Sequence, residues 1–459
     1  MGASIVTAPA EGERLKRQLG LASATAAVAG ECIAVGIFLT PAGMAKALGS
    51  PLWLLVMWAV VGAMTISGAL CYGELAGRFP RPGGTYVYLQ ETFGRGVAFL
   101  YGWMCMLVLD PGVTASLGVG IALYSAYVFH WPPLLVKLAA IGVIWALCIS
   151  NILSVRVSAG LLRWMTWLKL GVLALLVVWA LVFRLGAWSN FAPFVAQRSG
   201  SLPLLSALGA AFVGAFYSFG GWWDVSKIGG EVRDPARTLP RALVLGVVAV
   251  TAVYVLVSAV FWYLVPLDRV SSDEAFVAQV GEVLFGAAGG TVFAAIVIVC
   301  MAGSLAALIM SAPRVYYAMA SDGLFLPAFG RVHPRFETPA AAIAVQGTIA
   351  SLLVLLGTFQ QIIAYFVFIA VVFLSLAISS VFVLRRRPAP ESSVVLTPGY
   401  PVTPMIFLGL VVILLALVAV HSPRETLLGT AVVLAGVPVY LLTRHRLTPL
   451  RAEAGCESP

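Results

Sequence analysis

The sequence predicts an all-α polytopic membrane protein with twelve transmembrane helices. Of its 459 residues, 61% are hydrophobic and 10% are charged, whereas a soluble domain carries about 25% charged residues. Apolar runs of the roughly 20 residues that cross a bilayer recur along the whole chain. Lys and Arg gather in every second connection between these runs. Composition, spacing and charge therefore indicate the same class of protein.

Twelve apolar runs are long enough to span a membrane. Several exceed about 25 residues, so we expect these to tilt or to extend beyond the hydrocarbon layer. The runs cover residues 21–48, 51–79, 95–130, 133–154, 161–185, 204–229, 241–265, 282–320, 339–357, 359–385, 403–420 and 426–444.

The basic residues predict the orientation of these runs. With the N-terminus inside the cell, only six of the 28 Lys and Arg residues fall on the outer side, as the excess of positive charge in cytoplasmic loops requires. We therefore expect a multi-pass protein of the cell (inner) membrane with both termini cytoplasmic. Residues 1–20 are polar and basic, which favours a cytoplasmic segment over a cleaved signal. The six outer residues are Lys46, Lys137, Arg184, Arg198, Arg269 and Arg424.

Composition also excludes several functions. The net charge of +9 is scattered over short loops, so no basic face for nucleic acid is expected. The six cysteines show no paired spacing and the four histidines lie far apart, so we expect neither a disulfide framework nor a metal site, and no cofactor. These residues are Cys32, Cys71, Cys105, Cys148, Cys300, Cys456, His130, His333, His421 and His445.

Two apolar runs carry glycines beside polar residues, which a lipid-facing helix does not need. The first reads Gly30-Glu31-Cys32 and continues to Gly36, and the sixth contains Gly220-Gly221. A glycine inside a helix costs about 1 kcal/mol relative to alanine, so we expect both helices to break there. Breaks at matching positions of two halves indicate a transporter binding site, where free N–H and carbonyl groups bind the ends of a zwitterion. The alternative is that these glycines only allow close helix packing.

Four stretches, in order along the chain, carry a resemblance to a known family. They are Gly36-Ile37-Phe38-Leu39-Thr40-Pro41; Pro82-Gly83-Gly84-Thr85-Tyr86-Val87-Tyr88, in the loop after the second run; Gly220-Gly221-Trp222 with Glu231, Asp234-Pro235 and Leu239-Pro240-Arg241-Ala242; and Arg314-Val315-Tyr316-Tyr317-Ala318 with Asp322-Gly323-Leu324 and His333-Pro334-Arg335-Phe336. On these motifs the chain resembles the amino acid–polyamine–organocation (APC) superfamily and, within it, the L-type amino acid transporters. The resemblance covers residues 20–385 well and the last two runs weakly.

This resemblance implies a LeuT-like fold, a five-plus-five inverted repeat with broken helices 1 and 6. Residues 1–20 would be the N-terminal segment, 21–200 the first repeat, 201–390 the second, and 391–459 the last two helices and a cytoplasmic tail. The implied function is amino acid transport by alternating access, either sodium-independent exchange or proton-coupled import. The implied partners are a small-molecule amino acid and the lipid bilayer.

The resemblance also implies a substrate site between the two breaks. By position, the substrate carboxylate would meet the N–H groups of Val35 and Gly36. The amine would meet carbonyls near Cys32, Tyr217 and Gly220. Selectivity or gating is expected at aromatic side chains of the sixth run. The implied substrate-binding residues are Cys32, Ile33, Ala34, Val35, Gly36, Tyr217, Phe219, Gly220, Gly221 and Trp222.

The chain departs from the family pattern at two places. It has Ala34-Val35-Gly36 where the family usually has Gly-Ser-Gly, so one hydroxyl that could bind a carboxylate is missing. Between the third and fourth runs it has His130-Trp131-Pro132-Pro133, without the cysteine that joins eukaryotic L-type members to an ancillary subunit. We therefore expect no disulfide-linked partner.

We single out five ionisable residues within the predicted helices, where a charge costs on the order of 2.5–3.5 kcal/mol. Glu31 is expected to couple transport to protons or to bind a cationic substrate, or else to be a structural acid. Asp110 stands beside a Pro-Gly irregularity and has either a packing role or a contact with a cationic substrate. Asp224 and Lys227 are three apart and are expected to form a structural pair.

Lys169 has two possible roles. L-type members carry a lysine at this place, where sodium-coupled relatives hold a cation, so the resemblance implies sodium independence. The alternative is an interfacial anchor, because a lysine side chain can reach the membrane surface.

Three other functions are open to such a chain. Glu31 and Asp110 suggest a permease or antiporter for cationic amino acids or polyamines. An intramembrane enzyme is disfavoured because no HExxH or GxSxG motif is present. A channel is disfavoured because the sequence shows no filter of ringed carbonyls or charges.

Overall fold

A computed structural model of the chain describes residues 19–33, 36–79, 83–153, 159–269, 275–325, 329, 338–387 and 394–443. These residues are almost entirely helical and include no β-strand. The helices are α1 (Leu21–Cys32), α2 (Gly36–Leu39), α3 (Pro41–Leu48), α4 (Pro51–Arg78), α5 (Thr85–Phe93), α6 (Arg95–Met104), η2 (Cys105–Leu109), α7 (Asp110–Phe129), α8 (Pro133–Ile152), α9 (Ala159–Val182), η3 (Trp188–Phe191), α10 (Leu204–Phe219), η4 (Trp222–Glu231), α11 (Pro235–Leu264), η5 (Leu267–Arg269), α12 (Phe276–Ser321), α13 (Ala340–Leu356), α14 (Phe359–Leu384), α15 (Val402–His421) and α16 (Pro423–Thr443).

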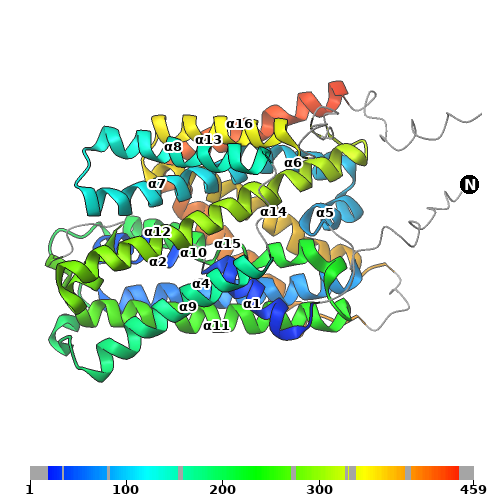
Figure 1. Cartoon of the computed structure of the whole chain (residues 1–459). Coiled ribbons are helices and arrows are strands. Elements are labelled where there is room, and N and C mark those ends of the chain that lie inside the picture. The colour runs from blue at the N-terminus through cyan, green and yellow to red at the C-terminus, as the bar shows by residue number, and fades with distance from the viewer. Residues whose placement is uncertain are drawn as a thin grey trace, which may run out of the picture.

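The long helices run along a common direction and form one bundle (Figure 1). Within the described residues, ten helices are long and apolar enough to cross a membrane, and two shorter apolar helical stretches occur at Trp167–Val182 and Ala340–Leu356. Large apolar side chains such as Trp167, Val412 and Leu442 are exposed on the outside of the bundle. Such a surface fits lipid rather than water. The chain is therefore a multi-pass membrane protein, as predicted.

Helix packing brings distant parts of the chain together. The most extensive contact is between α4 and α11, and α1 also packs on α11, while α7 packs on α12. The bundle interior is apolar, with large side chains such as Trp58, Tyr72 and Phe99 completely buried. These pairs surround the broken helices and hold them inside the bundle.

Both predicted breaks are present. Helix α1 ends at Cys32 and the helix resumes at Gly36, while α10 ends at Phe219 and continues after Gly220-Gly221 as the 3-10 helix η4. Gly221 has a φ of +96°, a conformation that side chains rarely adopt. The glycines of the sixth run therefore interrupt a helix rather than only allowing neighbours to approach.

Three other local features add detail to the predicted helices and loops. The irregularity expected at Asp110 is a π-helical turn, η2, directly before it. The run predicted at 282–320 lies in the 46-residue α12, which bends at Gly286, where φ is +74°. At 1.5 Å per residue, a straight helix of that length would exceed the bilayer thickness. The motif after the second run, predicted as a loop, forms helix α5 from Thr85 onward.

Candidate functional site

The two helix breaks contact each other directly. A Cβ atom added to Gly36 would overlap Ser218 of α10, and one added to Gly221 would lie 3.2 Å from the Glu31 carbonyl oxygen. Glycine is required at both positions because the opposite backbone approaches so closely. The breaks predicted from residues almost 190 positions apart, at Gly36 and Gly221, therefore form one structural unit.

Buried hydroxyl groups join the two breaks. Tyr254 Oη of α11 lies 2.8 Å from the carbonyl oxygen of Cys32 and 2.7 Å from that of Ser218. A hydroxyl has one proton, so it donates to one of these acceptors at a time. Thr40 Oγ1 also lies 2.7 Å from Ser218 Oγ. Each of these hydrogen bonds contributes about 0.5–1.5 kcal/mol to stability. Moving the two broken helices apart would therefore cost the free energy of the bonds that join them.

A cavity of about 100 Å³ lies at this junction. It has room for several water molecules or a small solute. Residues of α1, α2, η2, α7, α10, η4, α12 and α14 line it. The lining consists of Glu31, Cys32, Gly36, Leu109, Asp110, Val113, Leu117, Phe216, Tyr217, Gly220, Gly221, Trp223, Asp224, Lys227, Ser304, Leu308, Phe366, Val367 and Ala370.

The charges predicted inside the membrane lie on or beside this cavity. Lys227 Nζ is 2.7 Å from Asp224 Oδ1, so the predicted pair exists, although it lies on a 3-10 helix and on the cavity wall. Asp110, at the start of α7, accepts a hydrogen bond from the Tyr316 hydroxyl of α12. Buried acids with such partners cost less than isolated ones.

Lys169 approaches the cavity from outside its wall. Its ammonium donates to Ser304 Oγ at 2.7 Å, and Ser304 lines the cavity. The Lys169 side chain is only 5% exposed, and its positive charge acts on the carboxylate of Glu31. This burial contradicts the alternative of an interfacial anchor, because a snorkelling ammonium would be solvated.

Aromatic side chains form the apolar part of the wall. Tyr217 packs against Phe366 with ring centroids 5.9 Å apart, and its hydroxyl lies 3.0 Å from Ser116 Oγ. Phe216 and Trp223 stack with centroids 6.3 Å apart. The cavity therefore combines polar backbone, charged groups and aromatic faces, the usual mixture in a site for a small polar molecule.

The structure distributes the predicted substrate-binding residues unevenly. Cys32, Gly36, Tyr217, Gly220 and Gly221 line the cavity, together with Glu31 and Asp110. Ala34 and Val35 lie outside the described residues.

The other three predicted residues are buried away from the cavity lining. Ile33 is 1% exposed. Phe219 packs on Trp58 and Tyr254, and Trp222 packs on Tyr72. The predicted roles of Ile33, Phe219 and Trp222 stay predictions.

Several cavity residues were not assigned a role from the sequence. The sequence predicts Trp222 as a substrate-binding residue, but its neighbour Trp223 lines the cavity instead. The reason is that the helix continues after the glycine pair as a 3-10 helix, which changes the direction of the side chains. Ser304 and Phe366 come from apolar runs that carry no local signal. Tyr254 was missed for the same reason, although a buried tyrosine hydroxyl needs a partner.

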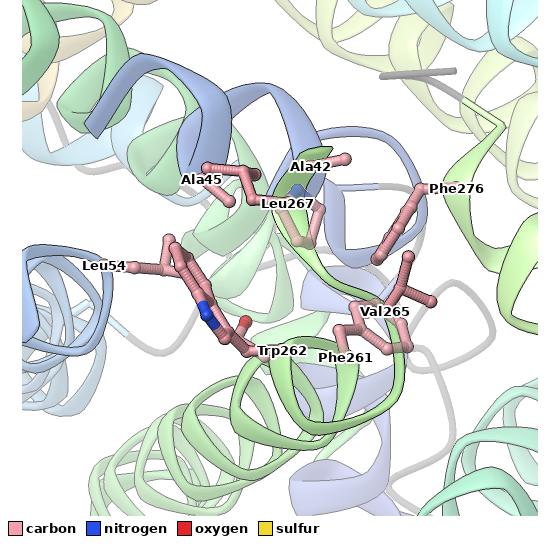
Figure 2. Close-up of a pocket in the computed structure, with 10 residues that line it drawn as sticks. Ala42, Ala45, Leu54, Phe261, Trp262, Val265, Leu267 and Phe276 are labelled. Atoms are coloured by element: carbon pink, nitrogen blue, oxygen red, sulfur yellow. The ribbon is translucent and has the colours of Figure 1, made fainter. Parts of the chain in front are cut away.

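Two other cavities differ from the central one. Figure 2 shows a pocket of about 20 Å³ whose apolar wall includes Phe261, Trp262 and Phe276 and no charged residue. It holds about one water molecule. A larger hollow of about 340 Å³ lies beside Thr40 and carries Lys46 and His421. Of these three cavities in the described part of the chain, the central one is lined both by residues of the two helix breaks and by charged residues.

No group of three His, Cys, Asp or Glu side chains in the described residues is arranged to hold a metal ion. The five cysteines within those residues are buried and free.

Comparison with known proteins agrees with this architecture. The family described as "Amino acid permease" matches residues 19–441. The serine/threonine exchanger SteT of Bacillus subtilis is 28% identical over 439 residues, which are 95% of this chain and 99% of the exchanger. The b(0,+)-type amino acid transporter 1 of Mus musculus is 28% identical over 440 residues, covering 93% of this chain and 88% of the transporter. The large neutral amino acids transporter small subunit 2 of Homo sapiens is 27% identical over 442 residues, covering 94% and 81%.

The match begins two residues before α1 and ends within α16, and so includes both broken helices and every element that lines the cavity. The predicted resemblance and the predicted transport function are thereby confirmed. The chain belongs to the amino acid permease family.

Proposed function

We propose that this permease is a sodium-independent amino acid exchanger that works by alternating access, with the central cavity as its substrate site. The observation that carries the proposal is the meeting of two broken helices at one charged cavity. The substrate carboxylate binds the N–H groups around Val35 and Gly36. The amine binds carbonyls at the ends of α1 and α10, since the C-terminal end of a helix attracts positive charge.

The proposed architecture is a twelve-helix, LeuT-like inverted repeat. The first repeat covers residues 21–200 and the second 201–390, and residues 391–459 add two helices and a tail. The position of the two breaks in the first and sixth runs supports this division. The distribution of Lys and Arg supports cytoplasmic termini for a protein of the cell (inner) membrane. Reporter fusions at both ends test the orientation, and activity of an external reporter at either end would contradict it.

Sodium independence rests on Lys169. Its ammonium lies beside Ser304 and acts on Glu31, in the region where, by resemblance, sodium-coupled relatives hold a cation. A fixed positive charge there repels a metal ion. Exchange is the favoured mode because SteT, with which the chain aligns over nearly its full length, is an exchanger.

The test is counterflow in proteoliposomes. A thermal-shift screen against the twenty amino acids and several amines first selects a substrate, since a ligand at 100 times its Kd stabilises by about 2.7 kcal/mol. Vesicles loaded with that unlabelled amino acid should accumulate its radiolabelled form, whereas empty vesicles should not. Uptake should be equal in sodium and choline buffers. Strict sodium dependence, or equal uptake by empty vesicles, would contradict the proposal.

A second coupling mode, import with protons, is favoured by the carboxylate of Glu31 on the cavity wall. Replacement Glu31→Gln keeps the shape and removes the titrating group. If protons drive uptake, this variant loses the pH dependence of the wild type. If the pH dependence is unchanged, Glu31 is a structural acid and exchange remains.

The proposed partners are an amino acid and the bilayer. The proposal includes no nucleic acid, cofactor or metal. It also includes no disulfide-linked ancillary subunit, because the loop at His130–Pro133 contains no cysteine.

A further inference from the structure

The cavity carries more charge than a neutral amino acid needs. Asp110 of α7 and Asp224 of η4 both face it, in addition to Glu31. Two carboxylates from two different elements make a site that attracts cations. Such a site would suit the side chain of arginine or lysine, or a diamine.

Lys227 already occupies this acidic part of the cavity. Its ammonium lies 2.7 Å from Asp224, and the two side chains are only 26% and 28% exposed. Asp110, the other aspartate of the cavity wall, accepts a hydrogen bond from the Tyr316 hydroxyl. The lysine is therefore paired with Asp224 and lines the same cavity as Asp110.

Glu31 has a different partner. The positive charge of Lys169 acts on it from α9, and its backbone lies against Gly221. Lys227 is therefore the lysine that pairs with a carboxylate of the cavity, Asp224, whereas the ammonium of Lys169 donates to Ser304. Lys227 is the charge that decides whether Asp110 and Asp224 are open to a ligand.

We propose that Lys227 is a built-in counter-ion that sets substrate charge: it pairs with Asp224 and offsets the negative charge that Asp110 and Asp224 give to the cavity wall, so that the cavity accepts amino acids without a cationic side chain and rejects arginine, lysine and diamines. This inference rests on the proposed substrate site. The physical reason is that a cationic side chain must either displace the ammonium of Lys227 or lie beside a like charge. Removal of the lysine exposes two carboxylates and reverses the preference.

The test compares Lys227→Met with wild-type protein. Methionine keeps an unbranched side chain without charge. In the wild type, arginine and putrescine should compete with the neutral substrate about tenfold more weakly than unlabelled neutral substrate does. In Lys227→Met, arginine and putrescine should compete, and stabilise the purified protein, at concentrations lower by about tenfold or more.

Three further variants serve as controls. Lys227→Arg keeps the charge and should keep the exclusion of arginine. The double variant Lys227→Met with Asp110→Asn should lose most of the gain, because one of the two carboxylates is neutral. Lys137→Met removes an exposed lysine that donates to the Leu355 carbonyl, and it should behave as wild type.

The outcomes separate the two proposals. If the wild type neither binds nor exchanges any amino acid, the proposed function is wrong. If it exchanges neutral amino acids and Lys227→Met gains no affinity for arginine or putrescine, only the counter-ion is wrong. Equal competition by arginine in the wild type would also overturn it. If Lys227→Met does not fold, Lys227→Gln and the wild-type competition test the same inference.

Discussion

Two groups of charges inside this molecule are built in opposite ways. The first, which we name the Glu74 cluster, consists of Glu74, Arg78, Arg385 and Thr397. Glu74 is completely buried and accepts hydrogen bonds from both arginines, at 2.9 and 2.6 Å for the shortest of each. It also accepts from the backbone N–H of Thr397 at 2.8 Å and from its hydroxyl at 2.7 Å.

The second group, the cavity cluster, consists of Asp110, Tyr316, Asp224 and Lys227. Its central pair, Asp224 and Lys227, is more than a quarter exposed, and the cavity reaches all of its members except Tyr316. In the proposed function, the charges of this cluster are the ones that a substrate can reach.

The difference teaches how to separate structural from functional charge. In the Glu74 cluster the carboxylate accepts hydrogen bonds from two arginines and from Thr397. It lines none of the three cavities described above, and the cluster ties α4 to α14 and to the segment before α15. In the cavity cluster the pairing is incomplete and borders free space. Burial alone therefore does not mark a functional charge, whereas burial with unfilled hydrogen-bonding capacity does.

The largest effect on stability is expected when the Glu74 cluster is broken. Glu74→Ala leaves Arg78 and Arg385, whose side chains are 7% and 19% exposed, without their shared carboxylate, which costs about 3–5 kcal/mol. Thermal unfolding of the purified protein measures this loss. Glu282→Ala is the matched control, since Glu282 is exposed and accepts one bond from Tyr127, and it should cost no more than about 1 kcal/mol. Equal stability of the two variants would contradict the structural role of the cluster.

The next effect concerns the break on which the cavity depends. Gly220 has φ of −51°, which valine can adopt, but a side chain there would meet the Tyr217 carbonyl oxygen at 3.0 Å and approach Trp223. We expect Gly220→Val to express normally and to lower uptake about a hundredfold, because the substrate groups are displaced. The control is Gly142→Val on α8, where nothing lies within 4 Å of an added Cβ. Normal uptake by Gly220→Val would show that the break is not the substrate site.

A smaller effect on transport is expected from substitution of Lys169, which shares one property with each cluster. It is almost fully buried, like Glu74, but its partner Ser304 lines the cavity. Lys169→Ala should insert normally and lose about 90% of transport, because an uncompensated Glu31 remains. Ser304→Ala removes only the hydrogen bond and should cost less. An unimpaired Lys169→Ala would mean that this buried lysine is not needed for transport.

Much of the fold followed from hydropathy and glycine content. Each predicted apolar run lies on a helix, and the run at 359–385, for example, differs from α14 by one residue. The breaks at Gly36 and at Gly220-Gly221 were predictable because glycine destabilises a helix locally. The bend at Gly286 was missed because a single glycine in an apolar run is equally compatible with close helix packing.

The candidate site was only partly predictable. Glu31, Cys32 and Tyr217 were found because they stand next to the breaks. Trp223 was missed in favour of Trp222, since side-chain direction after the glycine pair depends on the 3-10 geometry of η4.

The sequence by itself determined that this protein crosses a membrane, where its helices run, where two of them break and several of the charges that lie inside, although Glu74 was not among those identified. These properties are local, because each depends on the solvation and backbone preference of neighbouring residues. Only the tertiary structure decided how those charges are paired. Glu74 meets Arg385 across 311 positions of the chain, and Asp110 on α7 meets Tyr316 on α12 across 206 positions. Helix packing determines which residues so far apart in the sequence become partners. The interior of the bundle has low polarity, so a charge left there without a partner would be costly.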